Sequence, residues 1–266
     1  MQRPPLDAEQ LRRSLLESPE LSFFSRIDIV ESTGSTNTDL IARATEPDIG
    51  NAVLLAESQS HGRGRHARAW VSPPRAQLAM SLLVKLDGVA PAALGWLSLL
   101  TGIAVVDALR ATAGVSAELK WPNDVLIDGR KVAGILAEVA TGGAAPIVVV
   151  GIGLNVSLTE EELPVPHATS LVLAEAKQTD RTVLVRALLT EFAHRFTAWR
   201  DKDWLPGELA VAYRERCATI GTTVRAELPD GRTLTGVAEG IDDAGRLLID
   251  DEAVSAADVT HLRAQD

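Results

Sequence analysis

The sequence predicts an α/β protein in which helices flank a mixed sheet, followed by a small C-terminal β domain. Strand-like and helix-like segments mix through most of the 266 residues without a regular βαβ rhythm. This favours a mixed sheet with helices on one side over a doubly wound parallel sheet. After residue 217 the helical segments give way to short strands and turns. We therefore expect two domains, residues 1–217 and 218–266.

The strands of the large sheet are predicted from short apolar runs bounded by turn residues. Asp128-Gly129 and Thr141-Gly142-Gly143 are the clearest turn signals. Gly151 and Gly153 predict that the last strand runs into a glycine turn. The predicted strands are Val53–Glu57, Leu78–Lys85, Glu118–Trp121, Val125–Ile127, Val132–Val139 and Ile147–Ile152.

Two long helices are predicted from apolar residues at helical spacing, one over Asp180–Arg200 and one around Leu97–Leu109. A third helix begins within the polar run Glu31–Leu40, with Ser35 or Thr36 as its N-cap. The free N–H groups of such a helix start can also bind a polar ligand.

The C-terminal domain is predicted from three strand-like runs separated by hairpin turns at residues 229–231 and 242–245. A module of roughly fifty residues buries little core alone, so we expect it to lean on the larger domain. Its strands are Thr222–Leu228, Leu234–Glu239 and Arg246–Ile249.

The charge distribution points to a small anionic ligand. A net charge of -10 argues against general nucleic-acid binding, which depends on neutralising phosphates. Residues 58–86 nevertheless contain no Asp or Glu while carrying four arginines and Lys85. On an acidic protein this segment creates a local positive field.

Composition also predicts a cytoplasmic protein. The single cysteine, Cys217, excludes an internal disulfide framework, which fits a reducing compartment. The N-terminus lacks the apolar block of a secretory signal, and no run approaches the ~20 uninterrupted apolar residues of a membrane span. No role is predicted for residues 1–25.

The segment Gln59–Trp70, here called the arginine loop, is the first candidate binding element. Gly62 and Gly64 let the backbone approach a ligand closely, and Arg63 and Arg65 carry planar donors suited to carboxylate or phosphate oxygens. The alternatives are a solvated basic loop and a nucleic-acid contact.

The second candidate element is a predicted hairpin that carries two of the five lysines. Lys120-Trp121-Pro122-Asn123-Asp124 precedes the Asp128-Gly129 turn, and Lys131-Val132-Ala133-Gly134-Ile135-Leu136 follows it. Lysine in a chain with twenty-one arginines indicates that a compact point charge is needed here. The alternative is an ordinary strand pair with polar ends.

Several common sites are not supported by the sequence. Val156 stands where a dinucleotide fingerprint after Gly151 and Gly153 needs its third glycine, and there is no Gly-Lys-Ser/Thr of a Walker loop. The five histidines lack metal-ligand spacing, and no nucleophilic triad is evident.

Taken in order, these motifs resemble the biotin protein ligase family. The motifs are Ser35-Thr36-Asn37, Gln59 with Gly62-Arg63-Gly64-Arg65, the Lys120 and Lys131 strings, and Gly151-Ile152-Gly153-Leu154-Asn155. The resemblance implies a catalytic domain related to class II aminoacyl-tRNA synthetases and an SH3-like β barrel at the C-terminus. Because the Ser-Thr-Asn motif begins only at Ser35, it also implies the ligase-only class without a DNA-binding domain.

The resemblance implies a two-step ligase reaction. Biotin is adenylated by ATP with Mg²⁺, pyrophosphate leaves, and the biotinyl group passes to a lysine of a biotin carboxyl carrier domain of acetyl-CoA carboxylase or a related carboxylase. No tightly bound cofactor, nucleic acid or membrane is implied, and a monomer and a weak homodimer both stay open. The alternatives are a lipoate or octanoate ligase on the same fold and a nucleic-acid-binding module.

The resemblance also implies the residue roles. Lys131, Arg63 and Arg65 are implied as catalytic. Biotin binding falls to Ser35, Thr36, Asn37, Gln59, Arg63, Gly64, Arg65, Lys131, Gly134 and Leu136. The nucleotide falls to Arg65, Trp70, Lys120, Asn123, Lys131 and Asn155, and the metal to Asn123 and Asp124.

Overall fold

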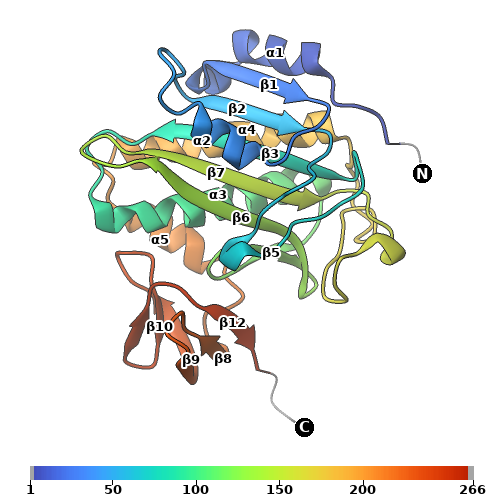
Figure 1. Cartoon of the computed structure of the whole chain (residues 1–266). Coiled ribbons are helices and arrows are strands. Elements are labelled where there is room, and N and C mark those ends of the chain that lie inside the picture. Colours follow the sequence, from blue (N-terminus) through green and yellow to red (C-terminus); the bar gives the residue numbers. More distant parts are fainter. Residues whose placement is uncertain (1–2, 263–266) are drawn as a thin grey trace.

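The computed structural model describes residues 3–262 (Figure 1), and its largest element is a seven-stranded sheet. β1 pairs with β2 in parallel and the remaining neighbours pair antiparallel, which confirms the predicted mixed sheet. In spatial order the strands are β1 (Arg26–Val30), β2 (Ala52–Ala56), β3 (Gln77–Lys85), β7 (Ile147–Asn155), β6 (Arg130–Thr141), β5 (Asp124–Ile127) and β4 (Ala117–Lys120).

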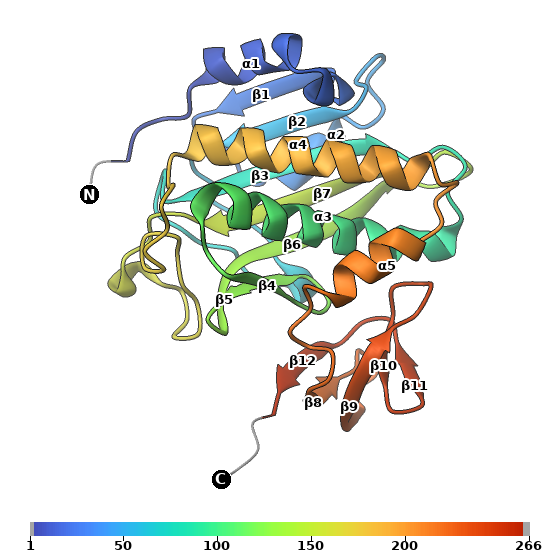
Figure 2. The same ribbon diagram turned by 180° about the vertical axis from the view of Figure 1, so that it is seen from behind.

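Helices cover both faces of this sheet unequally. The long helices α3 (Gly95–Ala108) and α4 (Arg181–Arg200) pack on one face, with α5 (Gly207–Arg214) beside them (Figure 2). α1 (Ala8–Glu17) lies along β1 at the sheet edge. The short α2 (Thr36–Ala42) lies on the opposite face, where its apolar side joins a second small core cluster. The expectation of helices on one side therefore holds only for the long helices.

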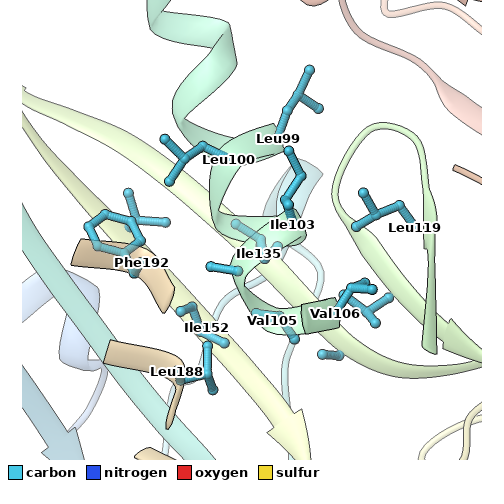
Figure 3. Close-up of a cluster of buried hydrophobic side chains, with 14 of the residues drawn as sticks. Leu99, Leu100, Ile103, Val105, Val106, Leu119, Ile135, Ile152, Leu188 and Phe192 are labelled. Atoms are coloured by element: carbon cyan, nitrogen blue, oxygen red, sulfur yellow. The ribbon is translucent and has the colours of Figure 1, made fainter. Parts of the chain in front are cut away.

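The main core lies between the sheet and the two long helices. α3 is buried on nearly all sides because it is covered by the sheet and by α4, and Figure 3 shows Ile103 of α3 beside Ile135 of the sheet, with Phe192 of α4 in the same cluster. The burial of α3 also accounts for an apolar stretch that the sequence analysis did not identify. Residues 91–113 are long and apolar enough to cross a membrane, but most of that stretch is buried inside the protein as core.

The C-terminal module is a five-stranded antiparallel sheet, which confirms the predicted small β domain. Three of its strands were predicted, and those at residues 252–254 and 258–261 were not. It docks on the large domain through two indoles: Trp96 Nε1 donates to the carbonyl of Asp243 at 2.7 Å, and Trp121 Nε1 donates to that of Gly245 at 3.1 Å. The boundary between residues 217 and 218 stays a prediction. In spatial order the strands are β11 (Glu252–Val254), β10 (Leu247–Ile249), β9 (Thr233–Ile241), β8 (Thr223–Glu227) and β12 (Asp258–His261).

One predicted feature of the large sheet is wrong. The strand that begins at Ile147 does not turn at its glycines but continues to Asn155. Pairing with β3 and β6 keeps Gly151 and Gly153 in extended backbone. Glycine is required at both positions because side chains from other segments occupy the space above them. Together with Asn155 they form the floor of the site described next.

Candidate active site

A cavity of about 910 Å³ opens on the face of the sheet that carries α2. It lies between the sheet, the arginine loop and strand β12 of the C-terminal module. The cavity is lined by all fifteen residues to which the sequence analysis assigned a catalytic, biotin-binding, nucleotide-binding or metal role, namely Ser35, Thr36, Asn37, Gln59, Arg63, Gly64, Arg65, Trp70, Lys120, Asn123, Asp124, Lys131, Gly134, Leu136 and Asn155.

The floor of the cavity follows β7. Gly151, Gly153 and Asn155 face it because alternate residues of a strand point to the same side. At about 3.3 Å per residue, the floor from Gly151 to Asn155 is about 13 Å long. The cavity is therefore elongated, with different groups above each end.

The absence of side chains on this floor lets two other residues enter. A Cβ atom at Gly151 would overlap the amide of Asn37, and one at Gly153 would overlap the indole of Trp70. Gly134 on the neighbouring strand lies under the same indole, which an added Cβ would meet at 3.1 Å. The indole N–H of Trp70 donates to Gln77 Oε1, which fixes the ring over the middle of the floor.

Neutral hydrogen-bonding groups gather at the Gly151 end. Thr36 donates to Gln59 Oε1 from its backbone N at 2.8 Å and from its hydroxyl at 3.1 Å. Asn37 Nδ2 donates to the carbonyl of Leu136 at 3.1 Å and to Glu138 at 2.8 Å. Ser35, one of the two residues predicted as the N-cap, is the N-cap of α2. This end is preorganised for an uncharged polar ligand.

The arginines above the cavity are balanced by acids from distant parts of the chain. Arg63 pairs with Glu138 on β6 at 2.6 Å, and Arg68 pairs with Asp258 on β12. Within residues 3–262, Arg65 has no carboxylate partner; it donates to Asn123 Oδ1 at 3.3 Å and to a backbone carbonyl of the C-terminal module at 3.4 Å. Burial lowers the pKa of Arg65, so this guanidinium is a partly desolvated cation.

Two lysines approach the same carboxylate. Lys131 Nζ lies 2.6 Å from Asp124 Oδ1 and 5.5 Å from the centre of the Trp70 ring. Burial lowers the pKa of Lys120; nearby Asp124 opposes this shift and Lys131 adds to it. An anionic ligand bound here would supply further negative charge to both ammonium groups.

The metal assignment stays a prediction. Residues 3–262 contain no group of three or more His, Cys, Asp or Glu side chains that could hold a metal ion. The amide of Asn123 is engaged by Arg65 and by the carbonyl of Ile135, and Asp124 is paired with Lys131. A Mg²⁺ ion that arrives with a nucleotide would therefore find one partly available carboxylate.

The sequence analysis missed several residues of this cavity. Asp258, Thr260 and His261 come from β12, and Ser81 and Glu138 are bonded to the predicted residues from within the sheet. Their positions depend on strand pairing and domain docking between distant segments, for which the sequence carries no local signal. The glycines of β7 were noticed, but as a turn.

Comparisons with known proteins identify the family. Residues 29–155 match the model of the biotin/lipoate A/B protein ligase family, and residues 219–262 match that of the biotin protein ligase C-terminal domain. The biotin--[acetyl-CoA-carboxylase] ligase of Mycobacterium tuberculosis is 46% identical over 98% of this chain and 97% of its own length. The chain belongs to the biotin protein ligase family. This confirms the prediction of a biotin protein ligase and leaves lipoate ligase less supported.

Other relatives agree. The biotin--[acetyl-CoA-carboxylase] ligase of Paracoccus denitrificans is 36% identical over 82% of this chain and 91% of its own. The bifunctional ligase/repressor BirA of Escherichia coli is 34% identical, over 83% of this chain and 68% of its own. A solved biotin protein ligase from Aquifex aeolicus, in complex with biotin and ATP, superposes with a TM-score of 0.73 at 25% identity and covers 91% of this chain and 100% of that one.

The first test concerns the glycine floor. We expect Gly153→Ala to destabilise the fold by about 1–3 kcal/mol, because the added Cβ overpacks against the Trp70 indole, and to slow biotin-dependent adenylate formation by displacing that ring. Gly142→Ala is the control, since an added Cβ there meets nothing within 4 Å. Equal rates for the two variants in single-turnover assays would contradict this account of the floor.

The second test concerns the buried ammonium of Lys120. Because its pKa is lowered from the usual 10.5, the unfolded chain binds more protons than the folded chain between the two pKa values. Lys120 therefore destabilises the folded state at pH 7, and this effect fades as the pH rises toward 10.5. We expect Lys120→Met to unfold at higher urea than wild type at pH 7, with a smaller difference at pH 10. Lys85→Met, at an exposed position, is the control; a destabilised Lys120→Met at pH 7 would refute the argument.

Proposed function

We propose that this chain adenylates biotin with ATP and then transfers the biotinyl group to a lysine of a biotin carboxyl carrier domain. The observation that carries the proposal is the order of groups along one cavity: neutral hydrogen-bonding groups above Gly151 with the Arg63–Glu138 pair beside them, Lys131 near the middle, and Asn155 at the other end. An uncharged ring, a carboxylate and a nucleotide joined in a row fit this order.

The biotin ring would occupy the Gly151 end. Its ureido group offers two N–H donors and one carbonyl acceptor, and Ser35, Thr36 and Gln59 supply neutral partners of both kinds. Leu136 and Gly134 border an apolar slot for the bicyclic ring and its chain. Asn37 is already bonded to Leu136 and Glu138, so its role is to hold this wall in place.

Lys131 would act at the reacting centre. A carboxylate oxygen of biotin attacks the α-phosphorus of ATP, the bond from that phosphorus to the oxygen bridging the β-phosphate breaks, and pyrophosphate leaves. The two reactants are anions, so the ammonium of Lys131 and the guanidinium groups of Arg63 and Arg65 stabilise the charge that builds up between them. Asp124 holds Lys131 until the ligand takes its place.

The nucleotide would extend toward Asn155. Lys120 and Asn123 lie where triphosphate oxygens can reach them, Gly64 lets the arginine loop approach the ligand, and Trp70 lies beside the ammonium of Lys131. Mg²⁺ would enter with ATP as part of the substrate, and Asn123 and Asp124 would offer it side-chain oxygens. Phosphate binding raises the pKa of Lys120 back toward its usual value, since it supplies the missing counter-charge.

In the second step, the ε-amine of the acceptor lysine attacks the carbonyl carbon of biotinyl-AMP, loses a proton, and AMP departs. The adenylate fills the main cavity, so the amine needs another approach. A second cavity of about 660 Å³ shares Arg65 and Asn123 with the first and borders the C-terminal module, which supports it as the route for the acceptor. The reaction needs no nucleic acid, and we propose a cytoplasmic enzyme that works as a monomer or weak homodimer.

Replacement of Lys131 tests the function. We expect Lys131→Ala to lose about 3–4 kcal/mol of transition-state stabilisation, a fall of about 10²–10³ in biotin-dependent exchange of pyrophosphate into ATP. Lys85→Ala, at an exposed position, is the control. Near-normal exchange by Lys131→Ala would contradict its role, and faster exchange by wild type with lipoate than with biotin would favour the alternative substrate.

A further inference from the structure

The chain ahead of α1 is bonded to the segment that follows β7, beside the Asn155 end of the active-site cavity. We call residues 3–7 the N-terminal strap. Arg3 donates from Nε to the hydroxyl of Ser157 at 3.0 Å and from Nη2 to the carbonyl of Ser157 at 2.8 Å, and it forms an ion pair with Glu162. Its side chain is only 16% exposed, so these contacts are shielded from solvent. Figures 1 and 2 both place the strap at the end of the sheet where β7 finishes.

The base of the strap is anchored in the protein interior. The backbone N–H of Leu6 donates to Glu57 Oε1 at 2.6 Å, and the carbonyl of Pro4 accepts from Arg181 Nη2 at 2.7 Å. Glu57 and Arg181 form an ion pair at 2.6 Å, with 4% and 6% of their side chains exposed. Each member of this buried pair is also bonded to the strap. Releasing the strap would remove a hydrogen bond from each of two buried charged groups, so the strap is held in one position.

Arg3 therefore connects a fixed strap to the loop that follows β7, residues 157–168, here called the β7 loop. Pro164, Val165 and His167 of this loop line the cavity beyond Asn155. Its far end is bonded to the proposed reacting centre, since the backbone N–H of Lys131 donates to the carbonyl of His167 at 2.8 Å. The β7 loop thus spans from Arg3 to Lys131.

Glu162 is the charged contact within this loop. One of its carboxylate oxygens, Oε2, accepts from the backbone N–H of Thr159 at 3.0 Å and also meets Arg3. The hydrogen bond from Arg3 lowers the pKa of Glu162, so the carboxylate stays ionised and keeps both contacts at neutral pH. Without Arg3, only the backbone N–H of Thr159 would remain of these two contacts to the Glu162 carboxylate.

We propose that Arg3 is a positioning residue for the ATP site: it holds the β7 loop in the conformation that forms the nucleotide-side wall. This rests on the proposed function, which puts the nucleotide at the Asn155 end. The biotin end lies about four residues, roughly 13 Å, away along β7. Arg3 should therefore affect ATP and leave biotin binding unchanged.

The test compares Arg3→Ala, Arg3→Lys and Arg13→Ala. Arg13 is an exposed arginine on α1 and serves as the matched control. For Arg3→Ala we expect KM for ATP to rise about three- to tenfold, in the range for losing hydrogen bonds to a partly shielded charge, while KM for biotin and kcat stay within twofold. Arg3→Lys should recover part of the change, because it restores the charge but not both hydrogen bonds.

Amide hydrogen exchange of the ligand-free protein supplies a readout that needs no catalysis. We expect faster exchange in residues 157–168 of Arg3→Ala, with the rest of the protein unchanged. Unaltered exchange, faster exchange with an unchanged KM for ATP, or an equal rise in both KM values would each overturn the proposal. If wild type formed no adenylate, the proposed function would fail while exchange still reported whether Arg3 holds the loop.

Discussion

The active-site cavity exists because three central positions of the sheet carry no side chain. Gly151 and Gly153 on β7 and Gly134 on β6 leave a hollow that the amide of Asn37 and the indole of Trp70 enter. Any larger residue would close it, since the backbone of a central strand is held on both sides by its neighbours. The hollow also sets the order of groups along the floor, and the proposed arrangement of biotin, phosphate and adenosine depends on that order. These glycines act through their lack of a side chain and not through backbone flexibility.

Charge balance is the second constraint. An acidic protein concentrates cations above this floor, and all but one of the four described next are paired with a carboxylate. Arg63 and Arg68 are paired with carboxylates from β6 and β12, Lys131 is paired with Asp124, and Arg65 relies on neutral oxygen partners. The protein thus holds these cations in place without ligand. In the proposed mechanism, an anionic substrate replaces these partners. The pairing of Arg68 with Asp258 also makes the C-terminal module part of the wall around the site.

Local patterns predicted the parts of the fold that depend on local physics. Helical spacing located α3 and α4, the polar run before Leu40 gave the N-cap at Ser35, and Asp128-Gly129 marked the hairpin. The fifteen site residues came from motif order and family resemblance, and the structure brings them to one cavity. The β7 glycines were misassigned to a turn. Glycine is required there because of side chains that lie more than eighty residues away in the sequence. Strand β12 and the strap also escaped prediction, since domain docking and buried ion pairs such as Glu57 with Arg181 leave no periodic trace in the sequence.

The most direct test of the central claim is a crystal structure of the wild-type chain with biotinyl-AMP. The account predicts the ureido ring beside Thr36 and Gln59 above Gly151, the phosphate in contact with Lys131 Nζ, and the adenosine toward Asn155 and the β7 loop. In this complex, Lys131 Nζ should contact the ligand and should no longer pair with Asp124. A ligand bound in the reverse direction along β7, or one that leaves Lys131 paired with Asp124 and out of contact with the phosphate, would contradict it.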